Sequence, residues 1–152
     1  MATKRIADHS EFANDSKFVH RLLEQWQPSS YRPPERQQEQ DLLGWLRKRL
    51  PDVPILTQYG IAKGTADIVI EDSHLIELKL AFGEGSAAEF DRCIGQLWRY
   101  YHKWVKADRG PVYLVVVGES DAEFRDLLHV WFEEANEAFI LRSPFHLIEK
   151  RP

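Results

Sequence analysis

Apolar residues recur at helical spacing over four stretches of this chain. These stretches are Lys17–Trp26, Glu35–Leu50, Ala87–Ala107 and Asp121–Glu134, and each places its large apolar side chains along one side of a helix. Pro51 ends the second helix, because proline cannot continue a helical hydrogen-bond ladder. The pattern therefore predicts four amphipathic helices, the longest of them in the middle of the chain.

Short runs rich in β-branched and aliphatic residues lie between these helices and predict strands. Val53–Tyr59, Ala66–Ile70 and Leu75–Leu80 follow one another closely, so we expect an antiparallel meander. Val112–Val117 is apolar throughout, which is typical of a strand buried on both faces. Phe139–Ile148 is expected to supply one final short strand.

The order of the elements is helix, three strands, helix, strand, helix, strand, preceded by one further helix. Strands that alternate with helices in the second half favour a mixed sheet with helices on both sides, so the predicted class is α/β. Residues 1–34 are interpreted as an N-terminal arm and helix. The proline-rich stretch Gln27–Pro34 separates them from a single globular unit over residues 35–152.

Composition adds limits to this picture. The 152 residues are 43% hydrophobic and 29% charged, which fits one ordinary globular domain. The net charge of −4 argues against a uniformly basic nucleic-acid coat, although it permits a local basic patch. Cys93 is the single cysteine, so no intramolecular disulfide can form. Met1–Phe12 has no apolar core and no run reaches membrane-spanning length, so we expect a cytoplasmic protein without membrane contact.

Charged residues interrupt two of the predicted strands. Asp67 lies near the start of Ala66–Ile70, and Glu77 and Lys79 lie within Leu75–Leu80. Side chains alternate along a strand, so Glu77 and Lys79 should share one face while Ile76 and Leu78 occupy the other. Burying such charges costs free energy unless they are paired or used. We interpret the three charges as a metal-dependent active site.

Mg²⁺ suits this arrangement, because it binds one or two carboxylates together with other hard oxygens. Asp67 and Glu77 are the predicted ligands, the backbone carbonyl of Leu78 could add a third oxygen, and Glu39 could reach the same ion from its helix. Lys79 would orient the attacking water or stabilise charge developing on phosphorus. Gln96, on the long helix, could hydrogen-bond Lys79 or a substrate phosphate.

Each of these residues also has an ordinary structural explanation. An aspartate at the start of a strand is often a turn residue, and Glu77 with Lys79 could form a solvated strand face. Glu39 could simply meet water at a frayed helix end, an alternative of about equal weight. The apolar neighbours of Glu77 argue against a solvated strand, because charged residues on a solvated edge strand should have polar residues between them.

The longest helix is also the most basic one. Arg99, Tyr100 and Lys103 are candidates for nucleic-acid contact by charge and stacking, and Lys63 lies in the turn just before the strand that carries Asp67. A Lys/Arg-rich helix alone is more often only a solvated surface. Together with the acidic strands, the pattern favours cleavage of a phosphodiester.

The same residues closely resemble the PD-(D/E)xK nuclease superfamily, especially Holliday-junction resolvases and RecB-type nuclease domains. The resemblance rests on Glu39, Gly64-Thr-Ala-Asp67, Ile76-Glu77-Leu78-Lys79-Leu80 and Gln96-Leu-Trp-Arg-Tyr100. It implies an αβββαβ restriction-endonuclease-like core and a Mg²⁺-dependent nuclease that leaves 5′-phosphate ends, with Mn²⁺ as a substitute metal. Asp67 and Glu77 would then be metal ligands, Lys79 the catalytic lysine, Glu39 the helix carboxylate and Gln96 the supporting glutamine. Ala66 departs from the proline of the family's motif.

These observations lead us to expect a small DNA endonuclease, with junctions, branches and ends as the substrates considered. We further expect a homodimer, for which Trp98 and Trp45 could line the interface, and a partner protein could supply targeting. An inactive nuclease-fold module that binds nucleic acid or protein is the main alternative. A non-nuclease metal enzyme is a weaker one, and the lack of a phosphate-cradling glycine-rich loop excludes nucleoside triphosphatases from it.

Overall fold

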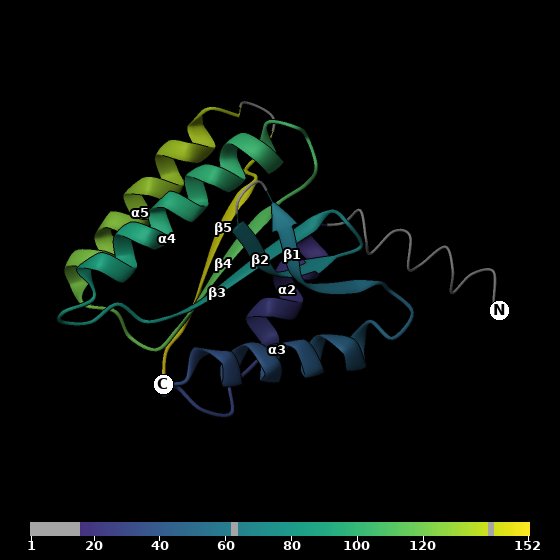
Figure 1. Ribbon diagram of the computed structural model, residues 1–152, viewed down its shortest axis with the longest axis horizontal. Coiled ribbons are helices and arrows are strands. Elements are labelled where there is room, and N and C mark those ends of the chain that lie inside the picture. The colour runs from purple at the N-terminus through teal and green to yellow at the C-terminus, as the bar shows by residue number, and fades with distance from the viewer. Residues whose placement is uncertain (1–15, 62–63, 140–141) are drawn as a thin grey trace.

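The elements of the computed structural model follow the predicted order (Figure 1). The structure describes residues 16–61, 64–139 and 142–152. The helical segments are α2 (Ser16–Gln25), α3 (Glu35–Arg49), α4 (Ala87–Tyr100), the π-helical turn η1 (Tyr101–Val105) and α5 (Ala122–Glu137). The strands are β1 (Ile55–Ile61), β2 (Gly64–Ile70), β3 (His74–Leu80), β4 (Val112–Val117) and β5 (Phe145–Lys150).

One mixed sheet organises the fold, with its strands in the order β1-β2-β3-β4-β5. β1, β2 and β3 form the predicted antiparallel meander, while β4 and β5 continue the sheet parallel to β3. Parallel neighbours need crossover connections, and α4 and α5 supply them. The predicted α/β class with a mixed central sheet is therefore confirmed.

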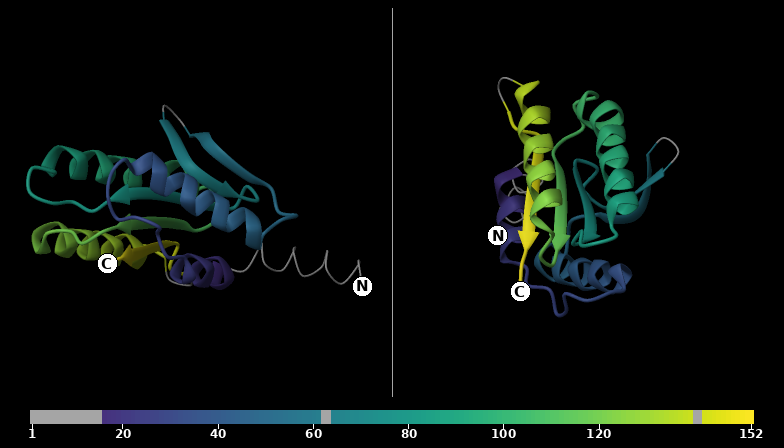
Figure 2. Two further views of the ribbon diagram at one scale, coloured as in Figure 1. Left: turned by 90° about the horizontal axis from the view of Figure 1, so that it is seen from below. Right: turned by 90° about the vertical axis from the view of Figure 1, so that its left-hand side faces the viewer.

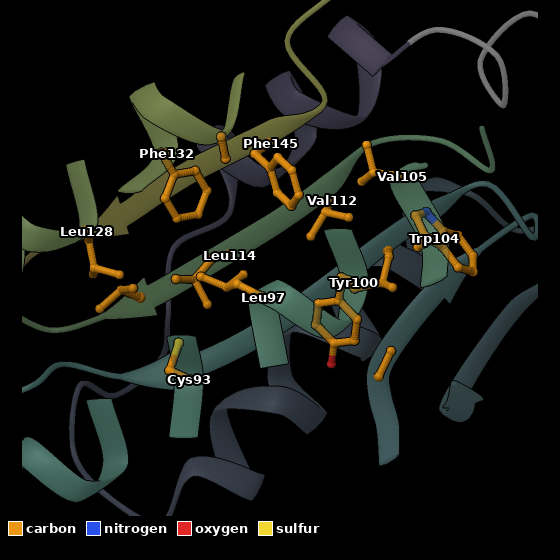
Figure 3. Packing of buried hydrophobic residues seen from close by; sticks show 14 of the residues in the cluster. Cys93, Leu97, Tyr100, Trp104, Val105, Val112, Leu114, Leu128, Phe132 and Phe145 are labelled. Carbon is orange, nitrogen blue, oxygen red and sulfur yellow. The ribbon is translucent and has the colours of Figure 1, made fainter. Parts of the chain in front are cut away.

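Helices cover both faces of the sheet (Figures 1 and 2). α4 and α5 lie side by side on one face, and the cluster between them and the sheet includes Leu97, Tyr100, Leu114 and Phe132 (Figure 3). α2 and α3 cover the other face and bury Trp26, among others. α2 thus shares a core with the sheet. Over the described ranges no helix is both long and apolar enough to cross a membrane.

The alternation of β3 positions the charges as predicted. Leu75 belongs to the cluster under α4 and α5, whereas Ile76 and Leu78 belong to the cluster under α2 and α3. Because side chains alternate, Glu77 and Lys79 share the α4 side of the strand with Leu75. Every residue of β4 is buried, which confirms the prediction of a strand covered on both faces.

Several element boundaries differ from the predictions, among them those of the long helix, β1 and β5. The long helix, expected to reach Ala107, ends as an α-helix at Tyr100 and continues as η1, where the Lys106 amide donates to the Tyr101 carbonyl. The wider turn keeps Trp104 and Val105 buried where a regular helix would rotate them differently. β1 and β5 each begin and end later than the hydrophobic runs suggest, because register with neighbouring strands sets their ends.

Gly110 is expected to be essential for the tight approach of two loops. Its φ is +139°, and a Cβ there would lie 1.8 Å from the carbonyl oxygen of Ser73. Gly110→Ala should therefore lower the free energy of unfolding by more than about 2 kcal/mol in chemical denaturation. Gly44→Ala is the matched control, since a Cβ at Gly44 meets nothing within 4 Å and alanine favours a helix. Equal effects of the two substitutions would contradict this explanation.

Candidate metal and catalytic site

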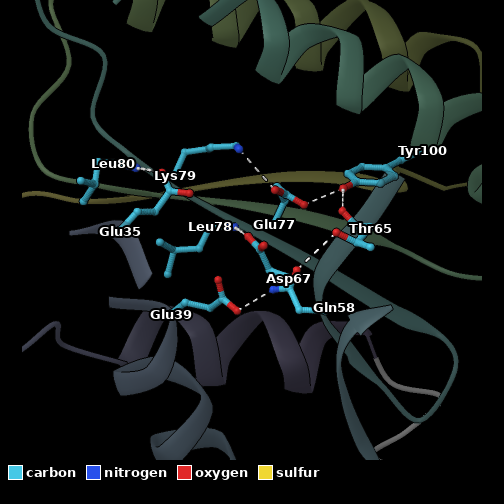
Figure 4. A network of polar contacts seen from close by, with 10 residues as sticks. All are labelled: Glu35, Glu39, Gln58, Thr65, Asp67, Glu77, Leu78, Lys79, Leu80 and Tyr100. Atoms are coloured by element: carbon cyan, nitrogen blue, oxygen red, sulfur yellow. Dashed lines mark hydrogen bonds and ion pairs between the residues drawn. The ribbon is translucent and has the colours of Figure 1, made fainter. Parts of the chain in front are cut away.

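The antiparallel pairing of β2 and β3 brings Asp67 and Glu77 to the same part of the sheet (Figure 4). The Leu78 amide donates a hydrogen bond of 2.8 Å to Oδ2 of Asp67. This bond fixes the Asp67 carboxylate beside the strand that carries Glu77. Asp67 is half-buried, so its side chain is partly accessible.

Glu77 is a buried carboxylate, with only 2% of its surface exposed. Its Oε1 accepts a hydrogen bond of 2.5 Å from the Tyr100 hydroxyl, and its Oε2 lies 3.4 Å from the Lys79 ammonium. Burial, reinforced by the nearby Asp67, raises the pKa of Glu77 to about 8 despite these two partners. The local charge is therefore too negative for a buried site, and an added cation would stabilise it.

Lys79 holds its charge close to three carboxylates. Burial is the largest single influence and disfavours the ammonium, but Glu77, Glu35 and smaller contributions that include Asp67 together outweigh it, so the pKa of Lys79 is raised. Lys79 is consequently a cation at neutral pH. It can act as a hydrogen-bond donor and as an electrostatic stabiliser, whereas a general base would need a lowered pKa.

Helix α3 contributes two carboxylates one turn apart. Glu35 Oε2 accepts a hydrogen bond from the Leu80 amide at 3.3 Å, and Glu39 Oε1 accepts one from Gln58 Nε2 at 3.0 Å. Burial is the main cause that raises the pKa of each, and Asp67 adds to the rise in both. Glu39 is thus half-buried beside Asp67 and not exposed at a frayed end.

Two hollows meet at Glu35. The larger one, about 650 Å³, lies between β3 and α4, and its lining includes Lys79, Gln96 and Arg99. The smaller one, about 350 Å³, is lined by Asp67, Glu39 and Gln58 among others. We call the larger hollow the cleft. A substrate in the cleft would lie against Lys79, whereas Asp67 and Glu39 face the smaller hollow.

The donor set fits a hard divalent cation. Asp67 and Glu77 offer carboxylate oxygens, Glu39 lies next to Asp67, and the raised pKa of Glu77 marks an excess of negative charge. In the described part of the chain, no three His, Cys, Asp or Glu side chains converge on one metal position. A magnesium ion would therefore be held by two carboxylates plus further oxygens, which is a usual arrangement for this ion.

Tyr100 was predicted to contact nucleic acid, and its environment does not allow this. It is fully buried, and its hydroxyl donates to Glu77 and to the Thr65 carbonyl. The rotation of α4 turns this residue toward the sheet, so Tyr100 positions Glu77. Burial raises the pKa of Tyr100, so the hydroxyl stays protonated and keeps donating.

The other predicted residues on α4 and η1 are half-buried or exposed. Gln96 lines the cleft with Lys79, and its Oε1 accepts no hydrogen bond from the described residues, so the predicted bond to Lys79 is not formed. Arg99 lines the same cleft and is half-buried, and Lys103 is exposed. Lys63 lies outside the described residues.

Sequence reasoning missed two residues of the site. Glu35 interacts electrostatically with Lys79 but was not assigned to the site, although its spacing of four from Glu39 places the two carboxylates on one side of the helix. Gln58 bonds both Glu39 and the Thr65 hydroxyl, and its φ of +50° is rare for a residue with a side chain. No sequence pattern marks Gln58.

The two tryptophans considered for a dimer interface differ in environment. Trp98 is 46% exposed and packs edge-on against Trp131 of α5. Trp45 is half-buried, and the guanidinium of Arg49 lies 3.8 Å from its ring centre. Trp98 therefore remains accessible, while Trp45 is partly covered by its own helix.

The fold and site together define an α/β protein with a carboxylate-lysine cluster at the sheet. Comparisons with known protein families, with curated proteins and with solved structures found no match to this chain. Functional conclusions therefore depend on the residues and their geometry.

Proposed function

We propose that this protein is a Mg²⁺-dependent nuclease that hydrolyses phosphodiester bonds in DNA. The observation that carries the proposal is the buried Glu77, which is held by Tyr100 and by Lys79, whose side chain lines the open cleft. A carboxylate whose burial raises its pKa this far destabilises the fold, and such groups cluster at functional sites. The resemblance to PD-(D/E)xK nucleases supports the same assignment and favours an endonuclease with 5′-phosphate products.

Asp67 and Glu77 would hold the metal, with the Leu78 carbonyl as a further oxygen and Glu39 in reach of Asp67. When bound, Mg²⁺ would acidify a water molecule and screen the charge of the phosphate. The Leu78 amide keeps Asp67 in place, and the Tyr100 hydroxyl keeps Glu77 in place. Both carboxylates are therefore positioned before a substrate arrives.

Lys79 would act on the substrate from within the cleft. Its ammonium can donate to the scissile phosphate or orient the attacking water, and it remains charged at neutral pH because carboxylates surround it. Gln96 faces the same hollow, and its buried Oε1 accepts no hydrogen bond from the described residues, so this oxygen could accept one from a phosphate-bound water. Glu35 fixes the end of β3 by accepting a hydrogen bond from the Leu80 amide.

A cleavage assay tests the proposal. Purified protein is incubated with supercoiled, linear, single-stranded and four-way-junction DNA, with Mg²⁺, with Mn²⁺ or with chelator. We expect metal-dependent cleavage of at least one substrate and loss of cleavage in Asp67→Asn. Absence of cutting for every substrate and metal would reject the nuclease assignment. DNA binding without cutting would instead favour an inactive nuclease-fold module.

Asp72→Asn serves as the control for Asp67→Asn. Asp72 is an exposed carboxylate in the β2–β3 turn, where it pairs with Arg109 at 3.0 Å, and its φ of +58° suits asparagine. The chemical change is the same, but Asp72 lines neither hollow, whereas Asp67 lines the smaller one. Cleavage should therefore survive in Asp72→Asn, and equal losses in both variants would contradict a specific role for Asp67.

A further inference from the structure

Cationic side chains are aligned along one side of α4 and η1. Arg92, Arg99 and Lys103 are separated by seven and four residues, so they recur after about two and then about one further turn. Arg92 and Arg99 both line the cleft, with Gln96 between them. We call Arg92, Gln96, Arg99 and Lys103 the α4 stripe. It leads from the cleft toward the end of the helix.

The charges of the α4 stripe are available to an external anion. Within the described ranges, neither Arg99 nor Lys103 has a carboxylate at ion-pair distance, and Arg92 pairs only with the exposed Glu89 at 3.3 Å. Arg99 is nevertheless half-buried. Leaving a guanidinium unpaired in a partly buried cleft has a cost, which an anionic ligand would remove.

Gly64 makes room for Arg99. A Cβ at Gly64 would lie 2.3 Å from Nη1 of Arg99 and 3.0 Å from Cζ. The guanidinium therefore lies directly over the backbone at the start of β2, the strand that carries Asp67. This contact fixes one cation of the stripe relative to the carboxylates.

We propose that the α4 stripe is a track for the phosphate backbone of a nucleic-acid strand, which leaves the cleft along α4. The inference rests on the proposed function and adds the path of the substrate. From Arg92 to Lys103 the stripe spans roughly 16 Å at 1.5 Å per residue. A DNA strand advances about 3.4 Å per phosphate, so the stripe matches about five consecutive phosphates.

Salt dependence of DNA binding tests the track. Affinity for a DNA duplex longer than the stripe is measured by fluorescence anisotropy over a salt series, with Ca²⁺ in place of Mg²⁺. In Arg99→Gln/Lys103→Gln the slope of log affinity against log salt should become shallower by about 1.8, because each phosphate contact contributes about 0.9. Arg21→Gln removes a cation from α2, on the other face of the sheet, and should leave the slope unchanged.

Two glycine variants that leave the net charge unchanged test the placement of Arg99. Gly64→Ala should displace the guanidinium and weaken binding roughly 5-fold without altering any charge. Gly60→Ala, in the neighbouring strand, is the control, since a Cβ there meets nothing within 4 Å. Unchanged affinity in Gly64→Ala together with unchanged slope in the double variant would overturn the track.

The outcomes separate this inference from the proposed function. A parent protein that cleaves DNA while the stripe variants bind with the parental slope keeps the nuclease and rejects the track. A parent protein that binds with the predicted slope change but does not cleave keeps the track and rejects the nuclease. If Arg21→Gln made the slope of log affinity against log salt shallower by as much as the stripe variants do, the track would also be rejected, because binding would then depend on net charge alone.

Discussion

Lys79→Met is expected to reduce DNA cleavage by roughly 100-fold or more while leaving the fold intact, because it removes the cation that would meet developing charge on the phosphate. Methionine retains an unbranched apolar side chain, so the packing of the Lys79 stem against the end of β3 is largely kept. The rate is measured under single-turnover conditions with saturating enzyme. Saturation removes contributions from weaker substrate binding.

The fold of Lys79→Met needs its own measurement, because its ammonium is a partner of the buried Glu77. Removing one member of a buried ion pair can be strongly destabilising. The penalty is limited here, since the pKa of Glu77 is about 8 and the side chain can take up a proton at neutral pH. A thermal melt and a circular dichroism spectrum should therefore remain close to those of the parent.

Lys48→Met provides the matched control for this substitution. Lys48 is exposed near the end of α3 and lines neither hollow. Its replacement should leave the cleavage rate within about twofold of the parent. If Lys79→Met cleaves as fast as Lys48→Met, then Lys79 has no part in the chemistry and the assignment of the site must change.

Local periodicity made the central part of the site predictable. Side chains alternate along every strand, so the placement of Glu77 and Lys79 on one face of β3 follows from their spacing alone. The same argument gives the apolar face of Ile76 and Leu78, which the structure places under α2 and α3. The sheet class follows equally from the alternation of strands and helices in the second half.

Other parts of the site depend on how elements pack, and sequence spacing does not contain that information. The approach of α3 to the end of β3 places Glu35 against the Leu80 amide, although only Glu39 was assigned to the site. The rotation of α4 buries Tyr100 against Glu77, where a surface role was expected. Gln58 depends on an unusual backbone angle within β1. Each is a tertiary contact between segments far apart in the chain.

Glu77→Gln is expected to stabilise the metal-free protein while eliminating its response to Mg²⁺. The pKa of Glu77 is about 8 in the fold and 4.5 when unperturbed, so the carboxylate opposes folding at any pH above its unfolded value. The cost is absent below about pH 4.5, grows between pH 4.5 and 8, and is then constant. A neutral glutamine can still accept the Tyr100 hydrogen bond. It should raise the free energy of unfolding by about 4 kcal/mol at pH 8.

Mg²⁺ should stabilise the parent protein but not Glu77→Gln. A ligand that binds the folded state stabilises it by mass action, so the parent should melt at a higher temperature as Mg²⁺ is added. Glu77→Gln lacks the charge that the cation would neutralise and should show little change. At low salt and high pH, Glu77→Gln should be more stable than the parent, and this difference in stability should shrink as the Mg²⁺ concentration rises. Such a result is expected of a carboxylate retained for metal binding.

Glu137→Gln tests whether the effect belongs to the buried site. Glu137 is an exposed residue at the end of α5, so the same chemical change should alter stability by no more than about 0.5 kcal/mol and leave any Mg²⁺ response intact. A less stable Glu77→Gln would mean that the carboxylate stabilises the fold through Lys79 and Tyr100. Equal Mg²⁺ stabilisation of Glu77→Gln and the parent would mean that the cation binds elsewhere. Either result would separate the burial of Glu77 from metal binding, and the case for a catalytic centre at β3 would lose its main physical support.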